Sequence, residues 1–166
     1  MPAQKERQTI VLASGAFDLL HLGHVKFLEE AKRMGGENAK LVVVVARDST
    51  VGRNKGRRPV VPENERRMLV ESLKVVDEAV LGSEDFNIGD VISTIRPDII
   101  ALGYDQTSMQ KRVKEYVAKN GLDVKVIKAS KFVADELDSS SKIQKKIVEK
   151  WMARQKSKKK AVDETA

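Results

Sequence analysis

The sequence contains no cysteine, only two histidines and few aromatic residues. Without cysteine there is no disulfide, no cysteine nucleophile and no thiolate metal site. No apolar run approaches the roughly 20 residues that a membrane-spanning helix requires. The polar stretch 1–8 lacks the apolar segment of a signal peptide. These absences lead us to expect a cytoplasmic location and no membrane partner.

The net charge of +7 is concentrated near one end of the chain. The stretch 142–160 holds nine basic residues against Glu149 alone, which accounts for the whole excess and leaves the rest close to neutral. Such a run is usually a solvated helix face followed by a frayed terminus. With few aromatic residues nearby to stack on bases, nucleic acid is not expected as a partner.

Strand-like and helix-like segments alternate along the 166 residues, a length that suits one domain with its own core. The unbroken run Val42–Val45 is typical of a parallel strand covered on both faces. Alternation of this kind predicts the α/β class: a single-domain, Rossmann-like, doubly wound parallel sheet of about five strands. We expect strands at 9–13, 41–46, 78–81, 98–102 and 124–129, and helices at 22–34, 63–73, 85–95, 108–120 and 139–154.

The last expected helix, 139–154, carries Ile143, Ile147 and Trp151 on one stripe, which we interpret as a packing face. The domain is therefore expected to span residues 1–155. Residues 156–166 are expected to form a basic, disordered tail. Small α/β domains often pair, so a homodimer stays open, although no residue indicates its interface.

The most informative motif is the run Gly15–His24, which joins the first expected strand to the first expected helix. His21 and His24 are three residues apart, on one face of a first helical turn. Unpaired N–H groups and the helix dipole attract anions there, and Gly23 removes a Cβ where a phosphate could approach the backbone. The alternative is that both histidines only hydrogen-bond around a helix start. Because both histidines of the chain stand in this spacing, we favour phosphate chemistry.

Ligands of such sheets bind beyond the carboxyl ends of the strands, and three further segments fall there. The loop 47–62 is either an ordinary solvated loop or a mobile cationic lid over a triphosphate, whose charges would stabilise departing pyrophosphate. Its cations are Arg47, Arg53, Lys55, Arg57 and Arg58.

The other two segments are Gly103–Gln106 and Ser139–Lys142. In the first, Asp105 beside a glycine could accept hydrogen bonds from a ribose or a base, or the segment is an ordinary turn. In the second, the serines are either helix N-caps or ligands of the β- and γ-phosphates.

The run Gly15–His24 matches every fixed position of GxFDxxHxGH, the signature of the nucleotidyltransferase superfamily of cytidylyltransferases and related adenylyltransferases. The chain resembles this superfamily over residues 9–152, with Gly103–Asp105 and Ser139–Lys142 at the places of its later motifs. A family arginine on the helix after the lid corresponds best to Arg67, with Arg66 a close competitor. The chain departs at 134–138, where glycerol-phosphate cytidylyltransferases carry Arg-Thr-x-Gly. Either the cation that clamps the phosphates in those enzymes is supplied here from elsewhere, such as Lys142 or the lid, or the preferred nucleotide differs.

The combined motifs look most like those of the archaeal FAD synthases, which adenylylate flavin mononucleotide (FMN). The resemblance implies AMP transfer from ATP to FMN. A divalent cation such as Mg²⁺ is expected because it bridges phosphate oxygens, and no carboxylate cage in the sequence indicates a metal site built by the protein. The resemblance also implies that His21 and His24 stabilise the α-phosphoryl transition state, and that Asp18 orders the turn or holds a metal-bound water. The implied nucleotide-binding residues are Ala16, Phe17, His21, Leu22, Gly23, His24, Gly103, Asp105, Ser140 and Ser141, with Lys55 and Arg67 on phosphate or substrate.

Two other interpretations stay open at this point. One is a CTP-dependent cytidylyltransferase that acts on glycerol 3-phosphate or a related polyol phosphate. The other is a nucleotide-binding or nucleic-acid-tethered regulatory module that has lost catalysis, which the basic tail and the missing arginine would suit.

Overall fold

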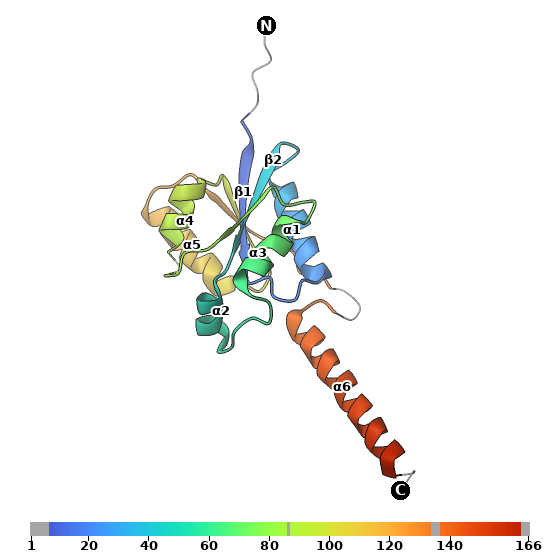
Figure 1. Ribbon diagram of the computed structural model, residues 1–166. Helices are drawn as coiled ribbons and strands as arrows, with labels where there is room; N and C mark the ends of the chain where they lie inside the picture. The colour runs from blue at the N-terminus through green and yellow to red at the C-terminus, as the bar shows by residue number, and fades with distance from the viewer. Residues whose placement is uncertain (1–6, 86, 134–136, 164–166) are drawn as a thin grey trace.

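A five-stranded parallel sheet forms the centre of the computed structural model, which describes residues 7–85, 87–133 and 137–163 (Figure 1). The strand order is β3-β2-β1-β4-β5, and every neighbouring pair is parallel. The order reverses between β1 and β4, which is where doubly wound sheets bind ligands. The predicted fold class is confirmed. The strands are β1 (Thr9–Gly15), β2 (Ala39–Val45), β3 (Glu78–Leu81), β4 (Ile99–Leu102) and β5 (Lys125–Lys128).

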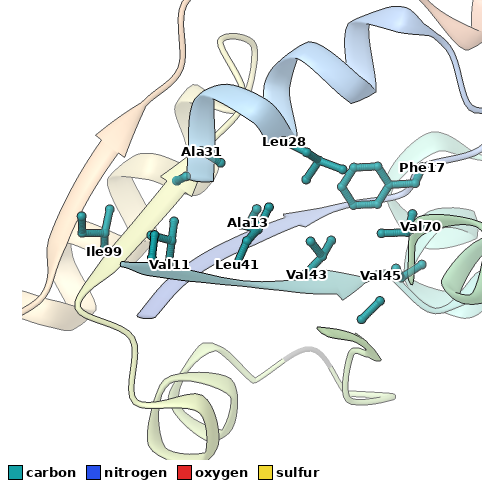
Figure 2. Packing of buried hydrophobic residues seen from close by; sticks show 13 residues of the cluster. Val11, Ala13, Phe17, Leu28, Ala31, Leu41, Val43, Val45, Val70 and Ile99 are labelled. Atoms are coloured by element: carbon teal, nitrogen blue, oxygen red, sulfur yellow. The ribbon is translucent and has the colours of Figure 1, made fainter. Parts of the chain in front are cut away.

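Helices cover both faces of the sheet because successive strand residues point to opposite sides. Val11 and Ala13 of β1 pack with α1 and α3, whereas Leu12 between them packs with α4 and α5. Figure 2 shows the first cluster, in which Leu28 of α1 points toward the strands. The helices are α1 (Leu22–Met34), α2 (Asp48–Lys55), α3 (Glu63–Glu71), α4 (Ile88–Ile95), α5 (Thr107–Lys119) and α6 (Ser140–Asp163).

The expected loop 47–62 contains the helix α2, which the sequence analysis missed. Most of its residues are poor helix formers, and Val51 is the one apolar residue of α2, so the sequence shows no apolar periodicity there. The helix is held by contacts outside itself: the Glu63 carboxylate accepts from the Asp48 backbone N–H at 2.7 Å. Gly56 ends it in the left-handed conformation at φ 67°, which glycine adopts without a Cβ clash.

The helix α6 extends away from the rest of the domain (Figure 1). The packing face predicted there is therefore wrong for two of its three residues: Ile147 is 58% exposed and Trp151 is 60% exposed. The helix also continues past Gln155, where a disordered tail was expected, and ends at Asp163. Lysine, alanine and glutamine are good helix formers, which accounts for the extension. Among the described residues, no helix is long and apolar enough to cross a membrane.

Candidate active site

A cleft of about 820 Å³ opens at the carboxyl ends of the strands. Residues that follow each of the five strands line it, together with the start of α6. They include Ala16 after β1, Arg47 after β2, Gly82 after β3, Gly103 after β4, Ala129 after β5, and Ser139, Ser140 and Ser141. The segments that the sequence analysis singled out therefore meet in one place.

The turn between β1 and α1 holds an unusual backbone conformation beneath this cleft. Phe17 and Leu19 have φ values of 50° and 49°, which residues with a Cβ rarely adopt. The Phe17 ring is buried and anchors the turn from below. Such conformations persist where the surrounding structure fixes them, and they concentrate at functional sites.

Asp18 orders this turn and ties it to the end of the segment 47–62. Its buried carboxylate accepts hydrogen bonds from the backbone N–H groups of Val60, at 3.0 and 3.1 Å, and Val61, at 3.1 Å. Of the two roles expected for Asp18, these contacts favour the ordering of the turn, because both carboxylate oxygens are engaged.

The two histidines line the cleft side by side. Their rings stack with centroids 3.7 Å apart, and the His24 ring lies 5.2 Å from that of Phe17. Within the described part of the chain, the buried Nδ1 atoms of both histidines have no hydrogen-bond partner. Buried polar atoms are normally paired, so these two nitrogens are candidates for contact with a ligand.

Burial favours the neutral form of both imidazoles. It lowers the pKa of His24 to about 3, with further lowering by the neighbouring His21 and by the Lys55 ammonium. Burial also lowers the pKa of His21, against an opposing effect of the Asp138 carboxylate. The sequence alone left the charge open. A neutral imidazole donates one N–H and accepts at its other nitrogen, so at pH 7 these residues act through hydrogen bonds rather than as cations.

The start of α6 is fixed against the turn by several contacts. A Cβ on Gly23 would lie 2.8 Å from the Asp138 carbonyl oxygen, so the glycine lets the backbone at Asp138 approach the start of α1. The expected neighbour of Gly23 was a phosphate. The Ser140 hydroxyl donates to the Asp18 carbonyl. Ser139 Oγ accepts from the Lys142 N–H at 3.3 Å, which confirms the N-cap interpretation for Ser139. Ser141 lines the cleft and is exposed.

Contacts hold much of the segment 47–62 in place. Arg47 donates to Glu63 at 2.7 Å and to the Gly82 carbonyl at 2.8 Å, and Arg53 donates to the Glu84 carbonyl at 2.7 Å. Arg57 donates to the Gln144 side chain on α6. The cleft lining nevertheless includes Lys55, Arg57 and Arg58, so positive charge faces the place expected for a triphosphate.

Neither arginine of α3 lines the cleft, but Arg66 contacts the carbonyls of Ala16 and Ala46, which border it. The Arg66 side chain is 0% exposed. Arg67 does not line the cleft and instead contacts Glu71 at 2.6 Å and the Ala79 carbonyl at 3.4 Å. The first choice of the sequence analysis is thus away from the cleft. Val70, a buried apolar residue of α3, lies four positions after Arg66 but three after Arg67, so its spacing in the sequence does not decide between the two arginines. Arg66 donates to the carbonyls of Ala16, Ala46 and Val61 and to the Asp48 carboxylate.

The loop after β4 is joined to the end of β1 through Gln106, which the sequence analysis did not single out for a role. Its side-chain oxygen accepts from the Gly103 N–H at 2.7 Å, and its amide donates to the Ser14 carbonyl at 3.4 Å. Gly103 and Asp105 both line the cleft. The segment is also an ordinary turn, closed by the Gln106 N–H on the Gly103 carbonyl at 3.0 Å.

Two other expectations come out differently. Leu22 is exposed on α1 and is absent from the cleft lining. Lys142, considered as a clamp cation, pairs with Asp138 at 2.6 Å. Of the segment 134–138, where the chain departs from the glycerol-phosphate enzymes, residues 134–136 lie outside the described residues.

Comparison with known proteins agrees with this site. The model of the family described as cytidylyltransferase-like matches residues 12–146. The chain is 48% identical over 142 residues to an FAD synthase of Methanopyrus kandleri, which covers 85% of this chain and 93% of that protein. It is 49% identical over 140 residues to an FAD synthase of Aciduliprofundum boonei, which covers 84% of this chain and 91% of that protein.

Solved structures share the fold. A crystal structure described as the lipopolysaccharide core biosynthesis protein from Thermoplasma volcanium is 43% identical, with a TM-score of 0.66, over 76% of this chain and 100% of that one. A pantoate-beta-alanine ligase from Francisella tularensis, at 13% identity and a TM-score of 0.56 over 81% of this chain and 63% of that one, shares the fold alone. With the motif, the sheet and the cleft in agreement, this chain belongs to the cytidylyltransferase-like family of nucleotidyltransferases.

Proposed function

We propose that this protein is an FAD synthase, which transfers AMP from ATP to FMN and releases pyrophosphate. The observation that carries the proposal is the 48% identity to an FAD synthase across nearly the full length of that relative. The cleft supports it, because the complete motif lies there with two neutral histidines whose Nδ1 atoms await a partner.

The reaction is a displacement at phosphorus. A phosphate oxygen of FMN attacks the α-phosphorus of ATP, the bond to the bridging oxygen of the β-phosphate breaks, and pyrophosphate leaves with the electron pair. No side-chain nucleophile is needed, so the protein contributes positioning and stabilisation of charge. His21 and His24 would donate N–H groups to oxygens of the α-phosphate, where negative charge crowds in the transition state.

The other predicted residues, except Leu22 and Arg67, line the cleft around this centre. The backbone at Ala16 and Phe17, with Gly23, would border the phosphates near the histidines. Ser140 and Ser141 would lie at the β- and γ-phosphates, and Lys55 would stabilise the leaving pyrophosphate. Gly103 and Asp105, which follow β4, also line the cleft and would contact the ribose or base.

A divalent cation is expected to enter with the triphosphate. Among the described residues, no group of three or more histidine, aspartate or glutamate side chains is placed to hold a metal ion. Mg²⁺ commonly binds through substrate phosphates and water with few protein ligands, which fits this donor set. MgATP would then be the form of the nucleotide that the cleft binds.

The proposal is tested by supplying purified protein with Mg²⁺, ATP or CTP, and FMN or glycerol 3-phosphate, and by following both pyrophosphate and FAD. We expect FAD from ATP and FMN. Pyrophosphate released only when CTP meets glycerol 3-phosphate would establish a cytidylyltransferase instead. Tight nucleotide binding with no product from any pair would establish a module without catalysis. The cytoplasmic location, the homodimer and the lack of a nucleic-acid partner stay predictions from the sequence.

A further inference from the structure

Thr50 on α2 carries a polar atom that the reaction as described does not use. Within the described residues, the buried side-chain atoms without a partner are Nδ1 of His21, Nδ1 of His24 and Oγ1 of Thr50. All three residues line the same cleft. Thr50 is 5% exposed, so its hydroxyl has little access to water. A buried hydroxyl without a partner costs free energy, which a ligand that supplies the missing hydrogen bond recovers.

The usual partner of a threonine hydroxyl within a helix is the carbonyl four residues earlier. For Thr50 that carbonyl belongs to Ala46, which lies before α2 and accepts from the buried guanidinium of Arg66 at 2.7 Å. Thr50 Oγ1 makes no hydrogen bond to it or to any other described atom, so it can bond a group that enters the cleft.

Thr50 lies on the β2–β3 side of the cleft. Arg47 and Arg53 hold α2 beside the turn after β3, through the carbonyls of Gly82 and Glu84. In the sheet order, β2 and β3 lie on one side of β1, and β4 and β5 lie on the other. Thr50 is therefore across β1 from Gly103–Gln106, the segment expected to contact the nucleotide.

The segment that carries Thr50 contributes the cations Arg47 and Lys55 to the cleft lining, and the lining on this side also has apolar side chains that suit a ring. Val44 of β2 and Val51 of α2 are buried apolar side chains of the cleft lining on this side. Gly82 adds a surface without a side chain. Ligand sites for planar rings combine such apolar walls with few polar groups that fix orientation.

We infer that the β2–β3 side of the cleft binds the isoalloxazine ring of FMN, and that Thr50 Oγ1 hydrogen-bonds the polar edge of that ring. The inference rests on the proposed function. The ring edge carries carbonyl and N–H groups, and a hydroxyl can serve either.

The test replaces Thr50→Val, which keeps the shape and removes the hydroxyl, and Thr50→Ser, which keeps the hydroxyl. The neighbouring Ser49→Ala is the control, because Ser49 is exposed and does not line the cleft. For Thr50→Val we expect the KM for FMN to rise about 3- to 10-fold, as for one lost hydrogen bond. We expect the KM for ATP and the melting temperature to hold, and Thr50→Ser and Ser49→Ala to stay within twofold of the wild type.

The outcomes separate this inference from the proposed function. If the wild type makes no FAD from ATP and FMN, the proposed function fails, and the inference fails with it. If the wild type makes FAD but Thr50→Val keeps its KM for FMN within twofold, only the inference is overturned. A change confined to the KM for ATP would also overturn it, and would place Thr50 on the nucleotide. An equal rise of both KM values with a lower melting temperature would assign Thr50 a purely structural role, which contradicts the inference.

Discussion

Replacing Arg66 with methionine tests whether a buried guanidinium holds the site together. Its Nε donates to the Val61 carbonyl at 2.9 Å, and its Nη2 donates to the Ala46 carbonyl at 2.7 Å and to Asp48 at 2.6 Å. Nη1 donates to the Ala16 carbonyl. These acceptors belong to the turn after β1, the end of β2, the start of α2 and the chain before α3. One side chain therefore joins four segments that border the cleft.

The Arg66→Met variant fills a similar volume and removes every one of these hydrogen bonds. Breaking one partner of a buried ion pair costs about 3–5 kcal/mol. The lower end of that range applies, because the Asp48 side chain is 33% exposed and water can replace part of the lost contact. We therefore expect a loss of about 3 kcal/mol in the free energy of unfolding, together with reduced FAD synthesis because the turn and α2 lose their common anchor.

The adjacent Arg67→Met variant is the matched control. Arg67 pairs with Glu71, whose side chain is 49% exposed, so its loss should cost less than about 1 kcal/mol. The assay is urea unfolding followed by far-ultraviolet circular dichroism. Tryptophan fluorescence is less suitable, because Trp151 is exposed on α6. Equal losses in the two variants, or a loss below about 1 kcal/mol for Arg66→Met, would refute the reasoning.

Three further predictions concern the histidines and the C-terminal helix. The His24→Ala variant should lower kcat about 10²- to 10³-fold, as for one preorganised donor; a kcat within threefold of the wild type would remove its assigned role. Because burial lowers the pKa of His24 to about 3 from 6.5, the folded protein binds fewer protons than the unfolded chain between these values. The free energy of unfolding should therefore decrease as the pH is lowered through this window, by up to about 2 kcal/mol between pH 7 and pH 5 from this residue. Urea unfolding curves in which the wild type and His24→Ala lose the same free energy between pH 7 and pH 5 would contradict this prediction. Deletion of residues 156–166 should leave kcat for FAD synthesis within twofold, and a tenfold loss would show that the end of α6 takes part in the reaction.

Elements with strong local signals could be predicted from the sequence. The helix α1 has the predicted bounds, because apolar residues recur along it and Gly35 follows its end. The run Val42–Val45 falls inside β2, since an unbroken β-branched stretch suits a strand buried on both faces. The motif Gly15–His24 located the turn, the histidines and the cleft for the same reason: its residues are adjacent in the chain.

The features that were missed depend on contacts between distant segments. The helix α2 has weak propensity of its own and is held by Glu63 and Gly82, which the sequence does not place beside it. Arg66 and Arg67 have the same chemistry, and only the phase of α3 against the sheet decides which one is buried. Thr50 became a candidate ligand only once its burial and its missing partner were known.

In the helix α6, the sequence predicted a packing contact that the structure does not have. Its apolar stripe has the spacing of a packing face, and the sequence gives no means to know whether a surface lies opposite. Ile143 is half-buried near the domain, but Ile147 and Trp151 extend beyond it. Periodicity identifies a face of a helix, whereas the presence of a neighbour is a property of the fold.

The central claim is that the protein transfers AMP from ATP to FMN and that His21 and His24 stabilise the transition state. The most direct test follows the α-phosphate of ATP. ATP labelled with ³²P at the α-phosphate is incubated with FMN and Mg²⁺, with wild type and with His24→Ala, and the products are separated. The account predicts that the label appears in FAD with the wild type, with unlabelled pyrophosphate released in equal amount, and that the rate falls about 10²- to 10³-fold in the variant. Label found only in AMP, or transferred to FAD at the same rate by both proteins, would contradict it.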